Sequence, residues 1–240
     1  MIKFENVSKV FGTGGGVAEI NLTIEKGEFV FLVGPTGSGK TTLFRLLIRE
    51  MLPTQGSITV GDFDIVTLAH KHLPNLRKKV GVVFQNLKLL ADRTIFENVL
   101  LPLEIAGVSD AESKRKVEEV LTHVGILEHK DKFPVQLSGG ELQRAAIARA
   151  LTLGPEVLLA DEPTGNLDAA TSWEIVKLLE NINMLGTTVL MATHNNEIVE
   201  KLAKRVITLE KGKMIGDKKH GHHKSEKTEK TEKAKEKEEK

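Results

Sequence analysis

The feature that most restricts the fold is an apolar run, Phe29–Val33, that ends abruptly in a glycine-rich loop. Leucines recur at helical spacing after that loop, so the order is strand, loop, helix. Glycines let backbone N–H groups close around phosphate oxygens, and the N-terminus of the following helix favours an anion. The Lys40 ammonium adds a positive charge and the Thr41 hydroxyl can ligate Mg²⁺. The sequence therefore predicts a phosphate-binding loop, made of Gly34, Pro35, Thr36, Gly37, Ser38, Gly39, Lys40, Thr41 and Thr42.

Length and composition limit the class of protein. With 240 residues and 40% apolar side chains, the chain can bury one sizeable core and a smaller lobe. Cysteine is absent, which excludes disulfides and thiol chemistry and fits a reducing cytoplasm. No apolar run approaches the roughly 18 residues of a membrane span, and the N-terminus has no apolar signal segment. Any role at a membrane is therefore expected to depend on a partner.

Charge is unevenly distributed along the chain. Residues 218–240 hold nine Lys and six Glu, so the remaining residues carry 25 basic against 27 acidic side chains. A nearly neutral body argues against nucleic acid as a ligand, because binding the phosphate backbone needs a basic face. The last segment contains Ala234 as its single apolar side chain. We therefore expect 218–240 to be a disordered tail.

Three further apolar runs, typical of strands buried on both faces, end in polar side chains. They are Val80–Phe84 before Gln85, Val157–Ala160 before Asp161 and Glu162, and Thr187–Ala192 before His194. Adjacent carboxylates at a strand end suit a metal ligand and a base, whereas a lone histidine is usually a surface residue. Ligands of open α/β sheets bind where the carboxyl ends of strands converge. We therefore expect all these side chains to share one site with Lys40.

Two segments have the Ser-x-x-Glu pattern of a helix capping box. Ser109 and Glu112 open a segment with apolar residues at helical spacing, and Ser138 and Glu141 open a second. In the second box the intervening residues are Gly139 and Gly140, which cost about 0.5 to 1 kcal/mol each relative to alanine. Bare N–H groups at a helix N-terminus also form an anion site, which explains the glycines better than a helix start alone.

Near the N-terminus, Ile2–Val7 and Val17–Ile24 alternate apolar and polar residues and predict antiparallel strands. The glycine-rich stretch between them is interpreted as a plain loop, not a second phosphate site. Phe11 precedes these glycines and is either a ring that stacks on a nucleotide base or a packing residue.

Leu87, Leu89 and Leu90 follow Gln85 without helical or strand periodicity. They form either an exposed patch for a partner or a buried loop.

Taken together, these motifs occur in the order and spacing of an ABC ATPase nucleotide-binding domain. The motifs are Gly34–Thr41, Gln85, Leu137–Glu141, Asp161-Glu162, Asn166-Leu167-Asp168 and His194, and the resemblance covers residues 1 to about 216. It implies an α/β P-loop NTPase fold with a RecA-like core, an antiparallel β-lobe and an inserted helical lobe at about 87–133. The implied domain spans 1–217.

The resemblance also implies a role for each site residue. Glu162 would polarise the attacking water and His194 would contact the γ-phosphate of ATP. Thr41, Asp161 and Gln85 would surround Mg²⁺. The chain would form a head-to-tail homodimer in the ATP state. Each nucleotide would lie between the phosphate loop of one subunit and the signature, Ser138-Gly139-Gly140, of the other. The remaining nucleotide contacts would be Phe11, Ser138, Gly139, Gly140, Glu141 and Asp168.

Within this superfamily the chain resembles the FtsE family of cell-division ATPases. Matching stretches include Gly27–Phe31, Lys88–Leu90, Thr171–Ile175 and Met191–His194. The resemblance implies a transmembrane partner of the FtsX type and a location at the cytoplasmic face of the cell membrane. Phe11 stands where tyrosine is commoner, and Asn195 where aspartate is usual.

Three alternatives to that function are open. The ATPases of lipoprotein-release and macrolide exporters share the Gly165–Asp168 segment. A scaffold that dimerises on ATP without hydrolysis would not need the complete Glu162 and His194 pair. A nucleic-acid-handling ABC protein is disfavoured by the acidic body.

Overall fold

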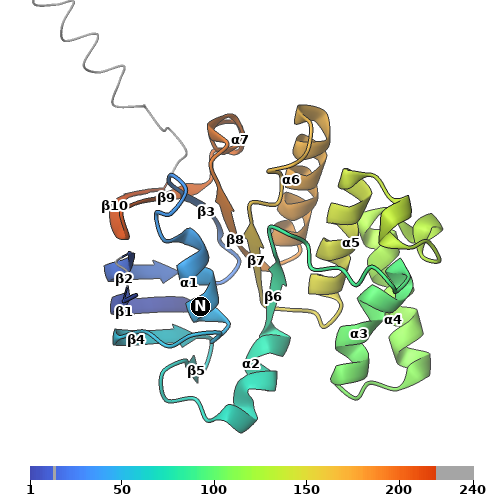
Figure 1. The fold of residues 1–240 in the computed structure, drawn as a ribbon, viewed down its shortest axis with the longest axis horizontal. Coiled ribbons are helices and arrows are strands. Elements are labelled where there is room, and N and C mark those ends of the chain that lie inside the picture. The colour runs from blue at the N-terminus through green and yellow to red at the C-terminus, as the bar shows by residue number, and fades with distance from the viewer. Residues whose placement is uncertain (13–14, 220–240) are drawn as a thin grey trace, which may run out of the picture.

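The strand before the phosphate loop lies inside a six-stranded sheet (Figure 1). The computed structural model describes residues 1–12 and 15–219. The strands are β3 (Phe29–Val33), β6 (Val80–Val83), β7 (Val157–Asp161), β8 (Thr188–Thr193), β9 (Arg205–Glu210) and β10 (Lys213–Lys218). Their order is β10-β9-β3-β8-β7-β6, with parallel pairing except between β10 and β9. The four apolar runs predicted as strands are therefore confirmed, and they are neighbours.

Strand β3 is buried on both faces because it separates two hydrophobic cores. Phe29, Phe31 and Val33 point into one core, and Val30 and Leu32 point into the other. Side chains alternate along a strand, so five consecutive apolar residues are what such a position requires. The phosphate loop is thereby attached to a strand whose position is fixed from both sides.

A second, antiparallel sheet packs on the core that contains Val30 and Leu32. Its strands are β1 (Ile2–Val10), β2 (Gly16–Ile24), β4 (Gln55–Val60) and β5 (Phe63–Asp64), in the order β2-β1-β4-β5. The predicted antiparallel pairing of the first two strands is confirmed, with Ile2 opposite Ile24. Both strands extend further toward their connecting loop than the alternation indicated.

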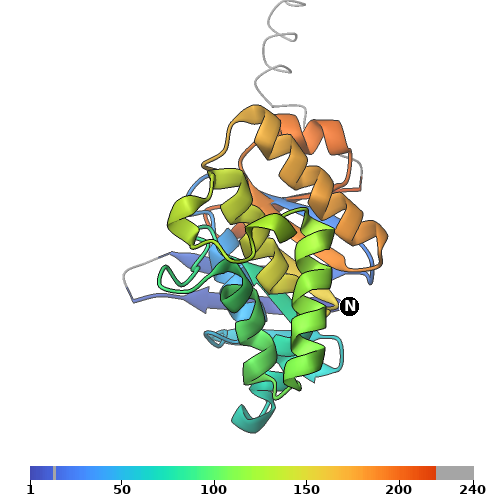
Figure 2. The same ribbon diagram turned by 90° about the vertical axis from the view of Figure 1, so that its right-hand side faces the viewer.

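Helices cover the six-stranded sheet and form a separate group beyond β6. The helices are α1 (Lys40–Leu47), α2 (Leu73–Lys79), α3 (Ile95–Ile105), α4 (Asp110–Val124), α5 (Gly139–Leu151), α6 (Ala169–Met184) and α7 (Asn196–Leu202). Helix α1 packs between the two sheets, whereas α3, α4 and α5 pack on one another. Figure 2 faces this three-helix group. Helices α3 and α4 both lie within the segment 87–133.

The two predicted capping boxes differ in the structure. Ser138 accepts a hydrogen bond from the Glu141 amide, and the Glu141 carboxylate accepts one from the Ser138 amide at 2.7 Å. Ser109 precedes α4 but makes no side-chain capping bond, so the prediction of a closed box there is wrong. The Glu112 carboxylate instead pairs with Lys116 one turn along α4, at 2.8 Å.

The C-terminal hairpin ends close to the predicted domain boundary. Strand β10 continues to Lys218, which pairs with Val206, so the first residue of the expected tail is in the sheet. Residues 220–240, where the rest of the predicted tail falls, lie outside the described residues. Within residues 1–12 and 15–219, no helix is both long and apolar enough to cross a bilayer.

Arg205 ties this hairpin to the rest of the sheet. Its guanidinium donates to Asp217 at 2.7 Å and to Glu28 at 3.0 Å. The hydrogen bond from Arg205 lowers the pKa of the Asp217 carboxyl, although partial burial opposes that effect. A carboxyl with a lowered pKa stabilises the fold above its ordinary pKa near 3.9, and this contribution is lost as the pH falls through the lowered value.

We expect Asp217→Asn to lower the free energy of unfolding by roughly 1 kcal/mol at neutral pH, a reduced value for a partly exposed charged pair. The difference from wild type should shrink as the pH falls from about 4 through the lowered pKa of folded Asp217, because the unfolded wild-type chain takes up the proton first. Denaturant melts of both proteins between pH 3 and 7 measure this. A difference that stays constant with pH would show that the Asp217 charge is not involved.

Candidate functional site

The phosphate loop is closely packed, and two of its glycines are required by contacts. A Cβ on Gly34 would lie 2.2 Å from the Leu209 carbonyl oxygen, and φ at Gly34 is +152°. A Cβ on Gly39, where φ is +109°, would lie 2.6 Å from the Val17 side chain. Side chains at either position would push the loop off the strands behind it. Glycine at both positions therefore allows the loop to keep the conformation in which its backbone N–H groups face a ligand.

Lys40 opens helix α1 and lies over the loop. Its ammonium donates hydrogen bonds to the carbonyls of Gly34 at 2.7 Å and Pro35 at 3.2 Å. It also lies 3.7 Å from the Glu162 carboxylate, and its side chain is only 8% exposed. A buried ammonium held by neutral carbonyls is ready to pair with a phosphate.

Thr41 and Asp161 form the candidate metal centre. The Thr41 hydroxyl donates to Asp161 Oδ2 at 2.9 Å. Asp161 Oδ1 is buried and makes no hydrogen bond among the described residues. Burial raises the pKa of the Asp161 carboxyl, while the Thr41 hydroxyl opposes that shift. An orphaned carboxylate oxygen beside a hydroxyl is what a hard cation such as Mg²⁺ would satisfy, so these residues fit the ion.

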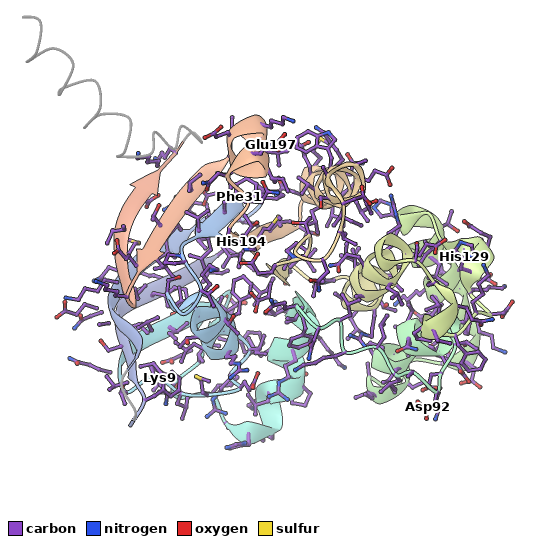
Figure 3. The ribbon with its side chains drawn as sticks, turned by 45° about the horizontal axis from the view of Figure 1, so that its top comes forward. Lys9, Phe31, Asp92, His129, His194 and Glu197 are labelled. Atoms are coloured by element: carbon purple, nitrogen blue, oxygen red, sulfur yellow. The ribbon has the colours of Figure 1, made fainter. Side chains whose placement is uncertain are left out.

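Glu162 and His194 form the second pair at this edge of the sheet. The Glu162 carboxylate accepts a hydrogen bond from His194 Nδ1 at 2.8 Å. Asp161 at the end of β7 lies opposite Ala192 in β8, so the two strands deliver these residues side by side. Glu162 has φ of +49° and is 11% exposed, whereas the His194 side chain is 70% exposed. His194 projects from the carboxyl end of the central strands (Figure 3).

One cavity of about 210 Å³ collects most of the predicted site. Its described lining is Gly16, Thr36, Gly37, Ser38, Gly39, Lys40, Thr41, Thr42, Gln85, Asp161, Glu162 and His194. The convergence predicted from strand ends is thereby observed. Gly34 and Pro35 contribute through their carbonyls, which hold Lys40.

Gly16 is a site residue that the sequence analysis missed, since its loop was interpreted as a plain connection. The carbonyl of Gly16 lies 2.5 Å from where a Cβ on Gly212 would stand, in the turn between β9 and β10. The Gly212 amide donates to the Ser38 carbonyl at 3.1 Å, and the Ala18 amide donates to the Gly212 carbonyl at 2.8 Å. Backbone from two segments that are distant in the sequence, at residues 16–18 and at Gly212, thus supports the phosphate loop. No side-chain pattern marks such contacts.

Phe11 lies beside this cavity, next to Gly16, but is not in its described lining. The residue is 36% exposed, and the Lys9 ammonium lies 5.9 Å from the centre of its ring. A half-exposed ring at the entrance remains compatible with stacking on a base.

The signature residues line a different cavity. It is formed by Ser138, Gly139, Gly140, Glu141, Arg144, Asn166, Leu167, Asp168, Thr171 and Glu174, and it shares no described residue with the phosphate-loop cavity. Asp168 caps α6 through Thr171, whose hydroxyl lowers the pKa of Asp168. Glu141 holds Ser138 and also accepts from His129 at 2.7 Å. In Figure 3, His129 lies in the helical group, away from His194.

Known proteins resemble this chain over nearly all of its length. The ABC transporter family model matches residues 17–165. The cell division ATP-binding protein FtsE of Bacillus subtilis is 47% identical over 226 residues, covering 94% of this chain and 99% of that protein. The FtsE of Escherichia coli K12 is 44% identical over 221 residues, covering 92% and 100%.

Solved structures agree with these relatives. The dimeric post-hydrolysis structure of the ATP-binding cassette MJ0796, bound to ADP and Pi, has a TM-score of 0.82 at 35% identity and covers 91% of this chain and 98% of that one. The predicted α/β P-loop NTPase fold is confirmed. The chain therefore belongs to the ABC transporter family of ATP-binding proteins, and within it to the FtsE cell-division group.

Proposed function

We propose that this chain is the ATPase subunit of a cell-division ABC system and that it drives an FtsX-like transmembrane partner from the cytoplasmic face of the membrane. The observation that carries the proposal is the meeting of Lys40, Thr41, Asp161, Glu162 and His194 in one cavity at the sheet edge. The group of relatives named FtsE supports cell division over the exporter alternative. Steady-state phosphate release by the purified chain tests the ATPase, and a scaffold that only binds ATP would release none.

Each residue of the cavity has a separate role in ATP hydrolysis. The phosphate loop and Lys40 bind and orient the β- and γ-phosphates of ATP. Thr41, Asp161 and Gln85 would hold Mg²⁺, which neutralises charge on the phosphates when it is bound. Glu162 orients and polarises the attacking water, since its carboxylate lies 3.7 Å from the Lys40 ammonium, whereas the Asp161 carboxylate is taken up by Thr41 and the metal. His194 fixes Glu162 through the 2.8 Å hydrogen bond, and we assign to it the contact with the γ-phosphate of bound ATP.

Dimerisation is the second part of the proposal. The signature cavity and the phosphate-loop cavity are lined by different residues of one chain. A second copy arranged head to tail would place Ser138, Gly139 and Gly140 over the nucleotide of the first. The dimeric form of MJ0796 supports this arrangement. We propose one such domain over 1–217, with 87–133 as its inserted helical lobe.

The leucines after Gln85 need a revised interpretation. Leu87 and Leu89 pack against the hydrophobic core, so they do not form the exposed patch, whereas Leu90 is 41% exposed. A larger surface lies next to them, a groove of about 500 Å³. Its apolar floor includes Leu101 and Leu153, and its rim is mostly basic. We assign this groove to a cytoplasmic segment of the membrane partner that carries apolar and acidic side chains.

We expect Leu101→Ser to weaken capture of the membrane partner by about tenfold, because a buried leucine contributes roughly 1.5 to 3 kcal/mol and Leu101 is partly covered in the free chain. ATP affinity of the purified variant should stay within about twofold. The measurement is co-purification of membrane proteins from the native host with each variant. Leu52→Ser is the matched control, since Leu52 is exposed outside the groove. Full capture by Leu101→Ser would place docking elsewhere.

Phe11→Ala is expected to weaken ATP binding by roughly 1 to 3 kcal/mol, the range for stacking of a base on an aromatic ring. Phe11→Tyr keeps the ring and should be close to neutral. Equilibrium titration with a fluorescent ATP analogue measures both, and GTP serves as a comparison because any base can stack. Equal affinity of wild type and Phe11→Ala would show that the ring only packs on the hairpin.

A further inference from the structure

The loop after Gln85 contains two consecutive residues in the left-handed region of backbone conformation. φ is +56° at Leu87 and +52° at Lys88. This region is uncommon for residues other than glycine, and especially for a bulky side chain such as leucine. The turn is also tight, because the Lys88 amide donates to the Asn86 carbonyl at 2.5 Å. Strained segments of this kind persist only where surrounding structure holds them.

Arg149, in the last turn of α5, holds this loop in place. Its guanidinium donates one hydrogen bond to the Leu87 carbonyl and one to the Lys88 carbonyl, each at 2.6 Å. Burial lowers the pKa of the Arg149 side chain. Within the described part of the chain no carboxylate forms an ion pair with it, so the two carbonyls are the partners that compensate its burial. A planar guanidinium can span two neighbouring carbonyls at once, which a lysine ammonium does less well.

The position of Arg149 connects two parts of the nucleotide machinery. Helix α5 begins at the signature, directly after Ser138, and Arg149 lies near its other end. The clamped carbonyls follow Gln85 by two and three residues, and Gln85 shares the cavity of Thr41 and Asp161. Arg149 therefore connects α5 to Gln85 through two hydrogen bonds and a few residues of backbone.

We propose that Arg149 is a positioning residue, which clamps the carbonyls of Leu87 and Lys88 and thereby keeps Gln85 at the site of the metal-bound nucleotide. This inference rests on the proposed function, in which Gln85 serves Mg-ATP. Helix α5 would then have two roles. Its N-terminus presents the signature to the nucleotide of the partner subunit, and Arg149 near its C-terminus positions Gln85 at the nucleotide of its own subunit.

A first experiment measures the loop without any ligand. Hydrogen exchange of the amides at 85–90 in the nucleotide-free chain should be about tenfold faster in Arg149→Lys than in wild type, because the left-handed pair loses one carbonyl contact. Amides in β3 should be unchanged. Arg115→Lys is the control, since Arg115 makes a comparable hydrogen bond to Glu119 on the exposed face of α4. Unchanged exchange at 85–90 in Arg149→Lys would overturn the clamp.

A second experiment separates the clamp from a general loss of packing. In the Arg149→Lys background, Lys88→Gly should restore slow exchange, because glycine adopts the left-handed region without steric cost. Lys88→Ala removes the same side chain and the same contact with the Phe84 ring, yet should not restore it. Rescue by both or by neither would overturn the proposal.

A variant with an intact Arg149 keeps the test valid if Arg149→Lys does not fold. A β-branched side chain is the most disfavoured in the left-handed region, so Lys88→Val should speed exchange at 85–90 several-fold relative to Lys88→Ala. Equal exchange in these two variants would show that the strained conformation does not control the loop.

The functional consequence is a change in metal dependence. Arg149→Lys should raise the Mg²⁺ concentration for half-maximal ATP hydrolysis by about tenfold, the lower end for losing a partner that orients a metal ligand. ATP affinity in the absence of Mg²⁺ should stay within about twofold, and Lys88→Gly should restore the metal dependence. Wild-type metal dependence in Arg149→Lys contradicts the inference alone, whereas a wild-type chain that fails to hydrolyse ATP contradicts the proposed function.

Discussion

Glu162→Gln should slow ATP hydrolysis by roughly 10² to 10⁴, the usual contribution of a positioned acid–base group. Glutamine has nearly the same shape, so the contact with His194 can be kept while the ability to attract the proton of water is lost. ATP binding should be retained, because the phosphate loop and Lys40 are unchanged. The bound ATP should therefore accumulate, and with it the homodimer.

Single-turnover phosphate release and size-exclusion chromatography with ATP measure both effects. Asp217→Asn is a suitable control, because it is also an acid-to-amide change but Asp217 lies in strand β10 and is not in the described lining of the cavity. Wild-type turnover by Glu162→Gln would remove Glu162 from this role. Loss of ATP binding would instead mean that the 3.7 Å contact between Lys40 and Glu162 is needed to keep the loop in place.

Ser138→Asp should abolish ATP-driven dimerisation while ATP still binds to single chains. Aspartate caps a helix as well as serine does, so α5 should still begin at residue 139. The new carboxylate, however, would face the triphosphate of the second subunit and repel it. Ser138→Asn caps equally well without the charge, and its dimerisation should be reduced far less. Equal behaviour of the two variants would contradict a phosphate contact at this position.

Mixing two inactive variants tests the head-to-tail arrangement more directly. Neither Ser138→Asp nor Lys40→Met should hydrolyse ATP alone. A mixed dimer contains one site with an intact phosphate loop and an intact signature. An equal mixture should therefore recover about a quarter of wild-type turnover if half of the dimers are mixed, and about a half if mixed dimers alone form. No recovery, from two folded variants that each exchange subunits, would argue against the head-to-tail arrangement.

The sequence predicted which residues meet at this edge of the sheet, because each of these residues is marked by its immediate neighbours in the chain. Each polar residue there directly follows an apolar run, and buried parallel strands end at one edge of a sheet. Lys40, Gln85, Asp161 and His194 were therefore placed together without knowing the strand order. The prediction used only the continuous apolar runs and the polar residue that follows each of them.

Contacts made by backbone atoms could not be predicted in this way. Arg149 bonds two carbonyls 61 and 62 residues away, and any residue type would present the same carbonyls. Gly16 was missed for a similar reason, because its importance lies in how closely the Gly212 backbone approaches it. Capping boxes show the limit of local patterns as well. Glu112 had a lysine one turn later and paired with it, so the box at Ser109 did not close.

The contact between Ser38 and Gly212 has a consequence for when the protein becomes active during its synthesis. The phosphate loop is made early, but the turn that supports it lies in the last hairpin of the described chain. Strand β3 also needs β8 and β9 as its neighbours, and both emerge from the ribosome late. A nascent chain therefore lacks the finished support of its phosphate loop until the turn at Gly212 has been translated. If the proposed function holds, chains that end before this turn would not close around ATP, and this would keep them from competing for the membrane partner.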